Sequence, residues 1–590
     1  MRKVFHSKKT ILFFILLGTM IVGVYVYPFL RAWETLGISE KGALEFGGDL
    51  HLYLNLINVK NLENGIIRNP WYHTEVPRGE IAFYRFPLAL EAFRCLKDLT
   101  GNNVAVVLWT ALWVGLACLS VVWLFWRVLQ VRKVFLIGAV LVVFHLWNLS
   151  DLKKIMDAWL YFPSFNGLYL PYMRTFFPLS VIAPIVAYIG LQIRALKTES
   201  WINWTLLVLI QFAALAAFPY ATLLMALISG FTLIMLALEG KAQHGWKWMV
   251  GFGVICTLMD GVYLYAMKPK ASYLREQSIM NVDFSRLSYL LGGTIGLIVI
   301  LSLVILFLRD QGFTEAKVTF VALGIGCSVL LAGDIFIDPR LQVSLHGNYF
   351  SHMTLALLGG YLSIRCSDAL AWRYPVSRWA LGGFIAVVLF HGLMVSNATY
   401  NRFKEYNRLQ EELAKIIGSL NLCDRDLVIC PAEAGTDVGA WLSLIAEAQV
   451  MFSFKSDYFL AEKDVEEIHR YRQALYFFMR GRGSEWLEDV IRNGSTRQKE
   501  DLLRIIERTD VRRPHFLELL LKIKETLVRS MDRIAQKDPK TIWFFRKFRR
   551  VLVIDFIDNP LFKKNRLNVY LRLVSETKAG PYLFGWYEAL

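Results

Sequence analysis

Long apolar segments separated by polar loops fill the first 396 residues of the chain. The apolar residues are continuous rather than spaced at amphipathic intervals, and a helix needs about 20 of them to cross a bilayer. About eleven segments are candidate spans with soft boundaries, near residues 10–30, 104–126, 134–150, 176–193, 203–218, 220–238, 248–267, 288–308, 318–336, 350–364 and 379–396. The pattern predicts an α-helical polytopic membrane protein whose transmembrane domain covers residues 1–400.

The longest polar interruption, residues 31–103, follows the first apolar segment and contains two helical patterns. The first pattern begins after Gly47-Gly48 and predicts a helix that lies on the membrane surface. Its apolar positions, at helical spacing, are Leu50, Tyr53, Leu54 and Ile57. A second surface helix is expected from Pro87 to about Gly101, since proline suits a first helical turn.

Between these two predicted helices the loop is rich in proline and aromatic residues. The segments Asn69–Tyr72 and Tyr84–Pro87 carry this composition, which is typical of irregular, substrate-facing loops. Arg85 in the second segment is therefore a candidate substrate-binding residue.

After residue 400 the charged residues become frequent and the apolar runs shorten. The change predicts a separate soluble α/β domain at residues 401–590 with a helical insertion. Helices are expected at Asn401–Leu420 and Asp437–Ala448, followed by a helix-rich stretch to about residue 537. Strands are expected at Asp426–Cys430, Gln449–Phe454, Val551–Phe556 and Tyr582–Tyr587.

Composition and the positions of basic residues predict how the chain lies in a membrane. With 55% hydrophobic and 19% charged residues, the chain is too apolar for an ordinary soluble enzyme. Arg2, Lys3, Lys8 and Lys9 precede the first apolar segment, so the positive-inside rule places the N-terminus in the cytoplasm. An odd number of crossings then places the C-terminal domain outside. The formal charge of +16 has no nucleic-acid-binding motif beside it, so we expect membrane lipids and not nucleic acid as partners.

The seven cysteines are scattered without the spacing of a metal site, and no metal ligand is assigned. Cys423 and Cys430 would share an oxidising compartment, where they could form a bridge or remain free thiols. In the same tail, Trp543–Arg550 interleaves aromatic and basic residues. This segment could hold a glycan or rest on headgroups, or it could be a solvated helix end.

An acidic residue, Asp49, stands close behind the first predicted crossing. Sugar transfer outside the membrane would use a donor anchored to a polyprenyl phosphate, and a carboxylate must take the proton from the attacking hydroxyl. Asp49 follows a flexible Gly47-Gly48 turn at the level of a lipid phosphate, which favours it for this role. An N-cap is its alternative role, and Glu45 and His51 could replace or assist it.

Basic residues in the outer loops are candidates for binding the phosphate of such a donor, because cations stabilise charge on a leaving phosphate. Arg340 and His346 are favoured, and Arg174, Lys268 and Lys270 are further candidates. Arg174 and the two lysines lie in outer loops with more basic residues than the topology favours. The alternative for each is contact with lipid headgroups, a common role of basic residues at helix ends.

With these features the chain resembles the GT-C superfamily of polytopic membrane glycosyltransferases, over roughly residues 10–400. The resemblance rests on the cytosolic N-terminus, the acidic residue early in the first outer loop, the surface helices and the exported C-terminal domain. It implies that Asp49 is catalytic and that Arg340 binds phosphate. It further implies a polyprenyl-phosphate sugar donor and a glycan, lipid or protein acceptor. No nucleotide cofactor is expected. Many members of the superfamily carry a paired acidic motif in the first loop, whereas here Asp49 is followed by Leu50, so a divalent-metal requirement stays open.

A multi-span transporter or lipid flippase is the main alternative function. Asp260, an ionisable residue within a predicted span, favours it. No internal repeat of the kind common in transporters is visible, and a large first loop with a folded tail has no obvious use in transport. A third alternative is a non-catalytic subunit of an envelope-assembly complex.

Overall fold

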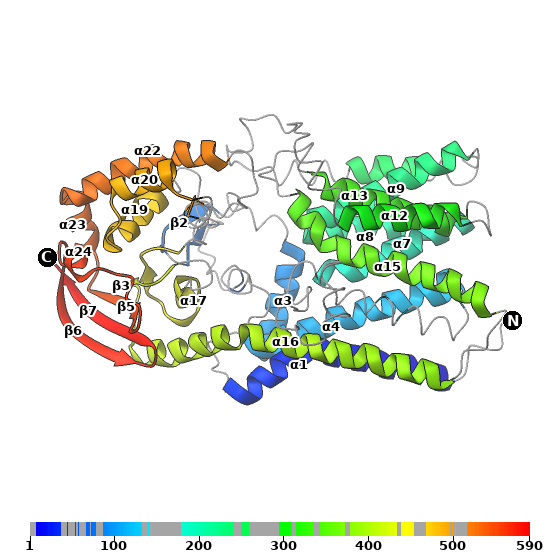
Figure 1. The fold of residues 1–590 in the computed structure, drawn as a ribbon, viewed down its shortest axis with the longest axis horizontal. Coiled ribbons are helices and arrows are strands. Elements are labelled where there is room, and N and C mark those ends of the chain that lie inside the picture. The colour runs from blue at the N-terminus through cyan, green and yellow to red at the C-terminus, as the bar shows by residue number, and fades with distance from the viewer. Residues whose placement is uncertain are drawn as a thin grey trace.

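The computed structural model describes residues 8–36, 44, 54, 57, 66–70, 72–77, 87–131, 140, 143, 179–239, 249–258, 294–308, 314–333, 343–371, 378–432, 438–453, 468–495, 498–499, 502 and 516–590. A bundle of apolar helices and a β-sheet with its own helices lie at opposite ends of an elongated molecule (Figure 1). Helix α16 (Arg378–Ser419) runs from the bundle into the sheet region. The predicted combination of a mostly helical chain with a C-terminal β-sheet is confirmed.

Within the described residues, five helices of the bundle are long and apolar enough to cross a membrane. These are α1 (Lys8–Leu36), α4 (Asn102–Trp123) with its π-helical continuation (Leu124–Val128), α7 (Leu179–Thr198), α9 (Pro219–Leu238) and α16. Further helices are α8 (Trp201–Ala217), Met249–Leu258, α12 (Thr294–Phe307), α13 (Glu315–Leu331) and α15 (Val343–Ala371). The predicted number of about eleven crossings is not confirmed, since several of these helices are short and residues 134–150 lie almost wholly outside the described part.

Two helix boundaries occur at the residues that predict them. Phe218 has an extended backbone (φ −159°, ψ 102°) between α8 and α9, because the following Pro219 disfavours a helical conformation before it. Pro219 then opens α9, as proline commonly does. Helix α3 (Pro87–Thr100) ends at Gly101, whose φ of +82° suits glycine.

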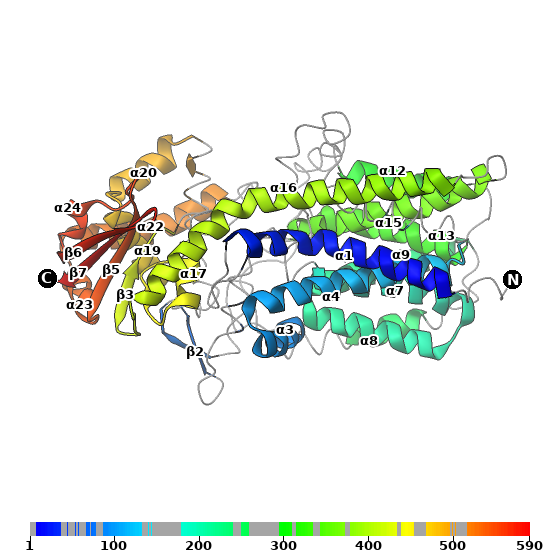
Figure 2. The same cartoon turned by 90° about the horizontal axis from the view of Figure 1, so that it is seen from below.

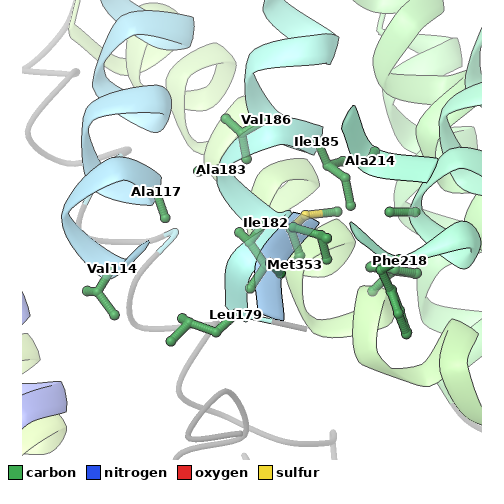
Figure 3. Close-up of a cluster of buried hydrophobic side chains, with 14 of the residues drawn as sticks. Val114, Ala117, Leu179, Ile182, Ala183, Ile185, Val186, Ala214, Phe218 and Met353 are labelled. Atoms are coloured by element: carbon green, nitrogen blue, oxygen red, sulfur yellow. The ribbon is translucent and has the colours of Figure 1, made fainter. Parts of the chain in front are cut away.

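Helix α7 forms the centre of the bundle, with 83% of its apolar span buried. Its buried face packs on side chains from several other helices. Ile182 of α7, for example, lies in one buried cluster with Phe218 and Met353 (Figure 3). Gly190 allows the Trp123 ring to lie directly against α7, and a Cβ atom at this position would overlap that ring. The close approach depends on glycine at position 190.

A buried polar network links α7 to α9. The Gln192 amide donates to Thr232 Oγ1 (2.8 Å) and accepts from Ser229 Oγ (2.9 Å), which lies 2.5 Å from the Tyr188 hydroxyl. Because these groups satisfy one another, the network stabilises the helix pair, as hydrogen bonds between polar side chains do in bundles of transmembrane helices.

Helices α1 and α16 pack side by side and run in the same direction (Figure 2). Ser396 Oγ donates to the Val24 carbonyl (2.6 Å), and further along both helices Thr35 Oγ1 lies 2.8 Å from the Tyr400 hydroxyl. The chain that follows α1 and the chain that follows α16 therefore leave the bundle at the same end.

Among the residues that the structure describes, the C-terminal sheet has five strands in the order β4-β3-β5-β7-β6. Strand β3 (Asp426–Ile429) pairs in parallel with β4 (Gln449–Val450) and β5 (Arg550–Phe556). Strand β7 (Tyr582–Ala589) is antiparallel to both β5 and β6 (Leu571–Ala579). One face packs on α16 and α17 (Val438–Ile445), and the other on α19 (Arg470–Met479), α20 (Ser484–Asn493) and α22 (Phe516–Ala535).

The structure adds two features that the hydropathy pattern does not predict. Strand β6 is exposed along nearly its whole length, so it has no apolar run to reveal it. In the first loop, Ile66–Arg68 (β1) and Glu75–Pro77 (β2) form an antiparallel hairpin around the segment predicted to be irregular.

Cys423 and Cys430 are free thiols, which resolves the two alternatives for this pair. Leu54 and Ile57 of the first predicted surface helix are buried, and its other positions lie outside the described residues.

Candidate functional site

The residues predicted to carry the chemistry lie almost entirely outside the described part of the chain. His346 has a described backbone, in the first turn of α15. The remaining candidates fall outside it; they are Asp49, His51, Arg85, Arg174, Lys268 and Arg340, together with the alternatives Glu45, Asp260 and Lys270. Their roles stay predictions, and the described residues define the surroundings in which they would act.

Two leucines that flank Asp49 in the sequence, Leu44 and Leu54, are buried in the core of the bundle. Leu44 is buried, and its backbone N–H donates to Asn103 Oδ1 (2.9 Å) at the start of α4. Leu54 is fully buried in the same apolar core. The start of α4 lies at the end of the bundle that faces the sheet region (Figure 2).

The β1–β2 hairpin of the first loop contacts the C-terminal domain. Asn69 closes the turn, because its side chain accepts the Tyr72 N–H (3.0 Å) and its backbone N–H donates to the Thr74 carbonyl (2.8 Å). This turn presents Tyr72, whose hydroxyl lies 2.9 Å from His469 Nδ1 just before α19. Two segments 397 residues apart thus share a buried hydrogen bond.

Arg472 on α19 is the buried cation of this contact. Its guanidinium donates to the Val450 carbonyl (2.9 Å) and to Gln449 Oε1 (3.3 Å). It also lies 4.2 Å from the centre of the Tyr72 ring and 5.2 Å from that of Phe544, which are favourable cation–π distances. We call Tyr72, His469, Arg472 and Phe544 the junction cluster.

The electrostatics of the junction cluster follow from burial among positive groups. Burial lowers the pKa of Arg472 to about 10, and the guanidinium remains charged at neutral pH. Burial, with Arg470 and Arg472 nearby, holds the pKa of His469 well below its usual value, so this imidazole is neutral. Burial and Arg472 likewise lower the pKa of Lys547. The region is electropositive, and Arg472 donates its hydrogen bonds to neutral oxygens.

The junction cluster can position a loop and attract anions, but it holds no carboxylate that could serve as a general base. Within the described residues, no three His, Cys, Asp or Glu side chains gather as metal ligands. Sequence reasoning did not single out His469 or Arg472. The available signal was basic residues at the start of an otherwise apolar helix, Arg470–Met479.

The aromatic and basic segment Trp543–Arg550 has mainly structural contacts. Phe545 is buried in the sheet domain, and Arg549 and Arg550 both bind the buried carboxylate of Asp426. Trp543 is exposed, with Lys547 Nζ 3.5 Å from its ring centre. Most of this segment therefore packs or pairs within the domain, as a helix end followed by a strand.

Comparison with known proteins gives a likeness in structure but none in sequence. No protein-family profile matches the chain, and no curated protein matches it. Among solved structures, the chain is similar to the arabinofuranosyltransferase AftD from mycobacteria, determined by single-particle cryo-electron microscopy. The two are 13% identical with a TM-score of 0.39, over 97% of this chain and 40% of that one. The chain thus spans well under half the length of that protein, and the likeness identifies neither a family nor an activity.

Proposed function

We propose that the protein is a membrane-embedded glycosyltransferase of the GT-C type that acts on the extracytoplasmic face. It moves a sugar from a polyprenyl-phosphate donor to a glycan, lipid or protein acceptor. The observation that carries this proposal is the parallel packing of α1 and α16. It brings the end of α1, which precedes Asp49 in the sequence, and the start of the C-terminal domain to one end of an apolar bundle.

The arrangement suits a lipid-linked donor. The isoprenoid tail requires an apolar surface, and the helices of the bundle carry exposed leucines and isoleucines. The sugar and phosphate require a polar space at the level of the headgroups, beside the end of the bundle. The junction cluster ties the first loop to the C-terminal domain there, which favours a fixed geometry for a reaction that depends on orientation. A transporter has no comparable use for this tie.

In the proposed reaction, the acceptor hydroxyl attacks the anomeric carbon of the donor sugar. Its bond to that carbon forms while the bond from the carbon to the phosphate oxygen breaks. Asp49 takes the hydroxyl proton, and polyprenyl phosphate leaves with both electrons of the broken bond. Arg340 and His346 stabilise the charge on that phosphate, with Arg174 and Lys268 as further cationic contacts. His51 and Arg85 contact the substrate from the first loop.

The test is sugar transfer by purified protein from a radiolabelled polyprenyl-phosphate sugar to an extract of envelope glycans, lipids and proteins. Asp49→Asn keeps the shape of the side chain and removes the base. We expect its rate to fall by roughly 10²–10⁴-fold, the range for loss of a general base. Glu34→Gln is the matched control, since it removes an exposed acid near the end of α1 that has no role in the proposed site, and it should retain most of the activity.

Two results would count against the proposal. Equal transfer by the wild type and Asp49→Asn would remove Asp49 from the mechanism. Movement of the labelled lipid across proteoliposome membranes, without any covalent sugar product, would favour the transporter or flippase instead.

A further inference from the structure

A cavity of about 470 Å³ lies on the outer part of the C-terminal sheet. Strands β5, β6 and β7 and the short helix α24 (Lys564–Leu567) surround it, at the end of the molecule away from the helical bundle (Figure 1). Side chains of different chemistry line it, chiefly Asp555, Lys563, Asn565, Glu576 and Tyr587. The size is that of a small-ligand site.

The floor of the cavity results from a glycine in the middle of β7. Gly585 pairs with Val553 on one side and Glu576 on the other, so a side chain here would fill the space above the sheet. The Tyr587 ring occupies part of that space, with its Cε2 atom 2.7 Å from where a Cβ of residue 585 would lie. The missing side chain thus leaves room for the Tyr587 ring, which lines the cavity by its edge and is only 4% exposed.

The rim of the cavity is fixed by Asp555. This buried carboxylate accepts three backbone N–H groups, from Phe556 (2.9 Å), Leu561 (2.8 Å) and Phe562 (2.9 Å). These bonds hold the loop that leads into α24. Lys563 N–H then donates to the Met479 carbonyl (2.9 Å), which ties the loop to α19. A rim held in this way needs little ordering when a ligand binds.

The charges of the cavity balance. Lys563 and Lys564 face Asp555 and Glu576, and Lys564 Nζ lies 2.9 Å from the Glu576 carboxylate. Within the described chain, the side chains of Lys563 and Asn565 and the Tyr587 hydroxyl make no hydrogen bond to the protein. The cavity therefore combines an aromatic wall and hydrogen-bonding groups with no net charge that would select an anion.

We propose that this cavity binds a neutral saccharide. A sugar ring presents C–H groups on one face, which would pack on the apolar floor formed by Leu583, Gly585 and the edge of Tyr587, and hydroxyl groups around its edge. Those hydroxyl groups can donate to Glu576 and accept from Asn565 and Lys563. The site is separate from the proposed transfer centre and would hold a glycan chain to the outer domain. The proposal rests on the cavity alone and holds whether or not the protein transfers sugar.

The experiment is saturation-transfer NMR on the full-length protein in detergent, with the methyl glycosides of neutral hexoses and pentoses as probes. Asn565→Ala removes a rim amide, and Asn568→Ala is its matched control, since Asn568 lies just beyond α24 and does not line the cavity. We expect Asn565→Ala to weaken binding about five-fold, which corresponds to one neutral hydrogen bond. Asn568→Ala should bind like the wild type.

Tyr587→Phe and Tyr587→Ala separate the ring from the hydroxyl. The phenylalanine variant keeps the aromatic wall and should retain most of the binding, whereas the alanine variant should lose it. A circular-dichroism spectrum equal to that of the wild type shows that the sheet remains folded. Binding that survives both Asn565→Ala and Tyr587→Ala would overturn the proposal, as would the absence of binding at millimolar saccharide.

An anion site is the remaining outcome, and it would also overturn the proposal. It would appear as binding of inorganic phosphate that competes with no saccharide and disappears in Lys563→Ala. Asp49→Asn should bind saccharide like the wild type. Failure of the transfer reaction and failure of this site are therefore distinguishable.

Discussion

Asp426 offers the most quantitative test of how the C-terminal domain is held together. Its carboxylate is fully buried at the start of β3 and binds two arginines at the start of β5. Arg549 donates at 3.1 and 2.9 Å and Arg550 at 3.3 and 2.7 Å, so each guanidinium binds through two nitrogens. The Cys423 N–H adds a fifth bond (3.1 Å). Asp426→Asn keeps the shape and removes the charge.

The pKa of Asp426 sets the size of the effect. Burial alone would raise it, but the hydrogen bonds from Arg550 and Arg549 outweigh burial and lower the pKa from 3.8 to about 2. A shift of this size corresponds to about 2 kcal/mol in favour of the folded state when the carboxyl is ionised. The arginine side chains are 53% and 36% exposed, so solvent screening reduces the value. We expect Asp426→Asn to cost about 1–2 kcal/mol.

The assay is hydrogen exchange of the full-length protein in detergent, read by mass spectrometry on peptides from β3 and β5. Asp424→Asn is the matched control, because Asp424 is exposed and lies 3.8 Å from Arg68. It should change stability by less than about 0.5 kcal/mol. Equal protection of β3 and β5 in the wild type and Asp426→Asn would refute the reasoning.

The pH dependence of this stabilisation has a defined sign. Because the folded pKa lies below the unfolded value of 3.8, the stabilisation is complete above that value and is lost as the pH falls toward about 2. Roughly half of it should remain at pH 3. An Asp426→Asn effect that is as large at pH 3 as at pH 7 would contradict the assignment to an ionised carboxylate.

Two further predictions concern contacts between distant segments. Tyr72→Phe removes the hydrogen bond to buried His469 and should destabilise the hairpin contact by about 1–2 kcal/mol, seen as faster proteolysis of the first loop; unchanged proteolysis would argue against the contact. Gly190→Ala should lower the melting temperature, because the added Cβ would overlap the Trp123 ring. Gly230→Ala is the control and should not lower it, because the space around Gly230 is open. Equal melting temperatures for both variants would exclude the close α4–α7 approach.

The sequence pattern predicts those features of the fold that depend on local chemistry. Pro219 begins α9 and Gly101 ends α3 because of their own backbone preferences, and both boundaries are confirmed. The strands β3, β5 and β7 are buried and therefore appear as apolar runs. Strand β6 lies at an exposed edge, where hydrogen bonding to β7 rather than side-chain burial determines it, and hydropathy cannot reveal it.

Contacts between distant segments lie beyond such reasoning. The junction cluster joins Tyr72 to His469 and Arg472, and nothing in the local sequence at either end specifies the other. The cavity likewise depends on strand register, which sets Gly585 between Val553 and Glu576. The predicted catalytic and phosphate-binding residues were inferred from topology and resemblance, and apart from the backbone of His346 they lie outside the described residues.

The most direct test of the central claim is transfer by the protein in proteoliposomes of known orientation. Vesicles would carry the radiolabelled polyprenyl-phosphate sugar, and a membrane-impermeant envelope glycan extract would be added outside as acceptor. The account predicts product only from molecules whose C-terminal domain faces the added acceptor, and almost none from Asp49→Asn. Product from molecules facing the opposite way, or undiminished product from Asp49→Asn, would contradict it.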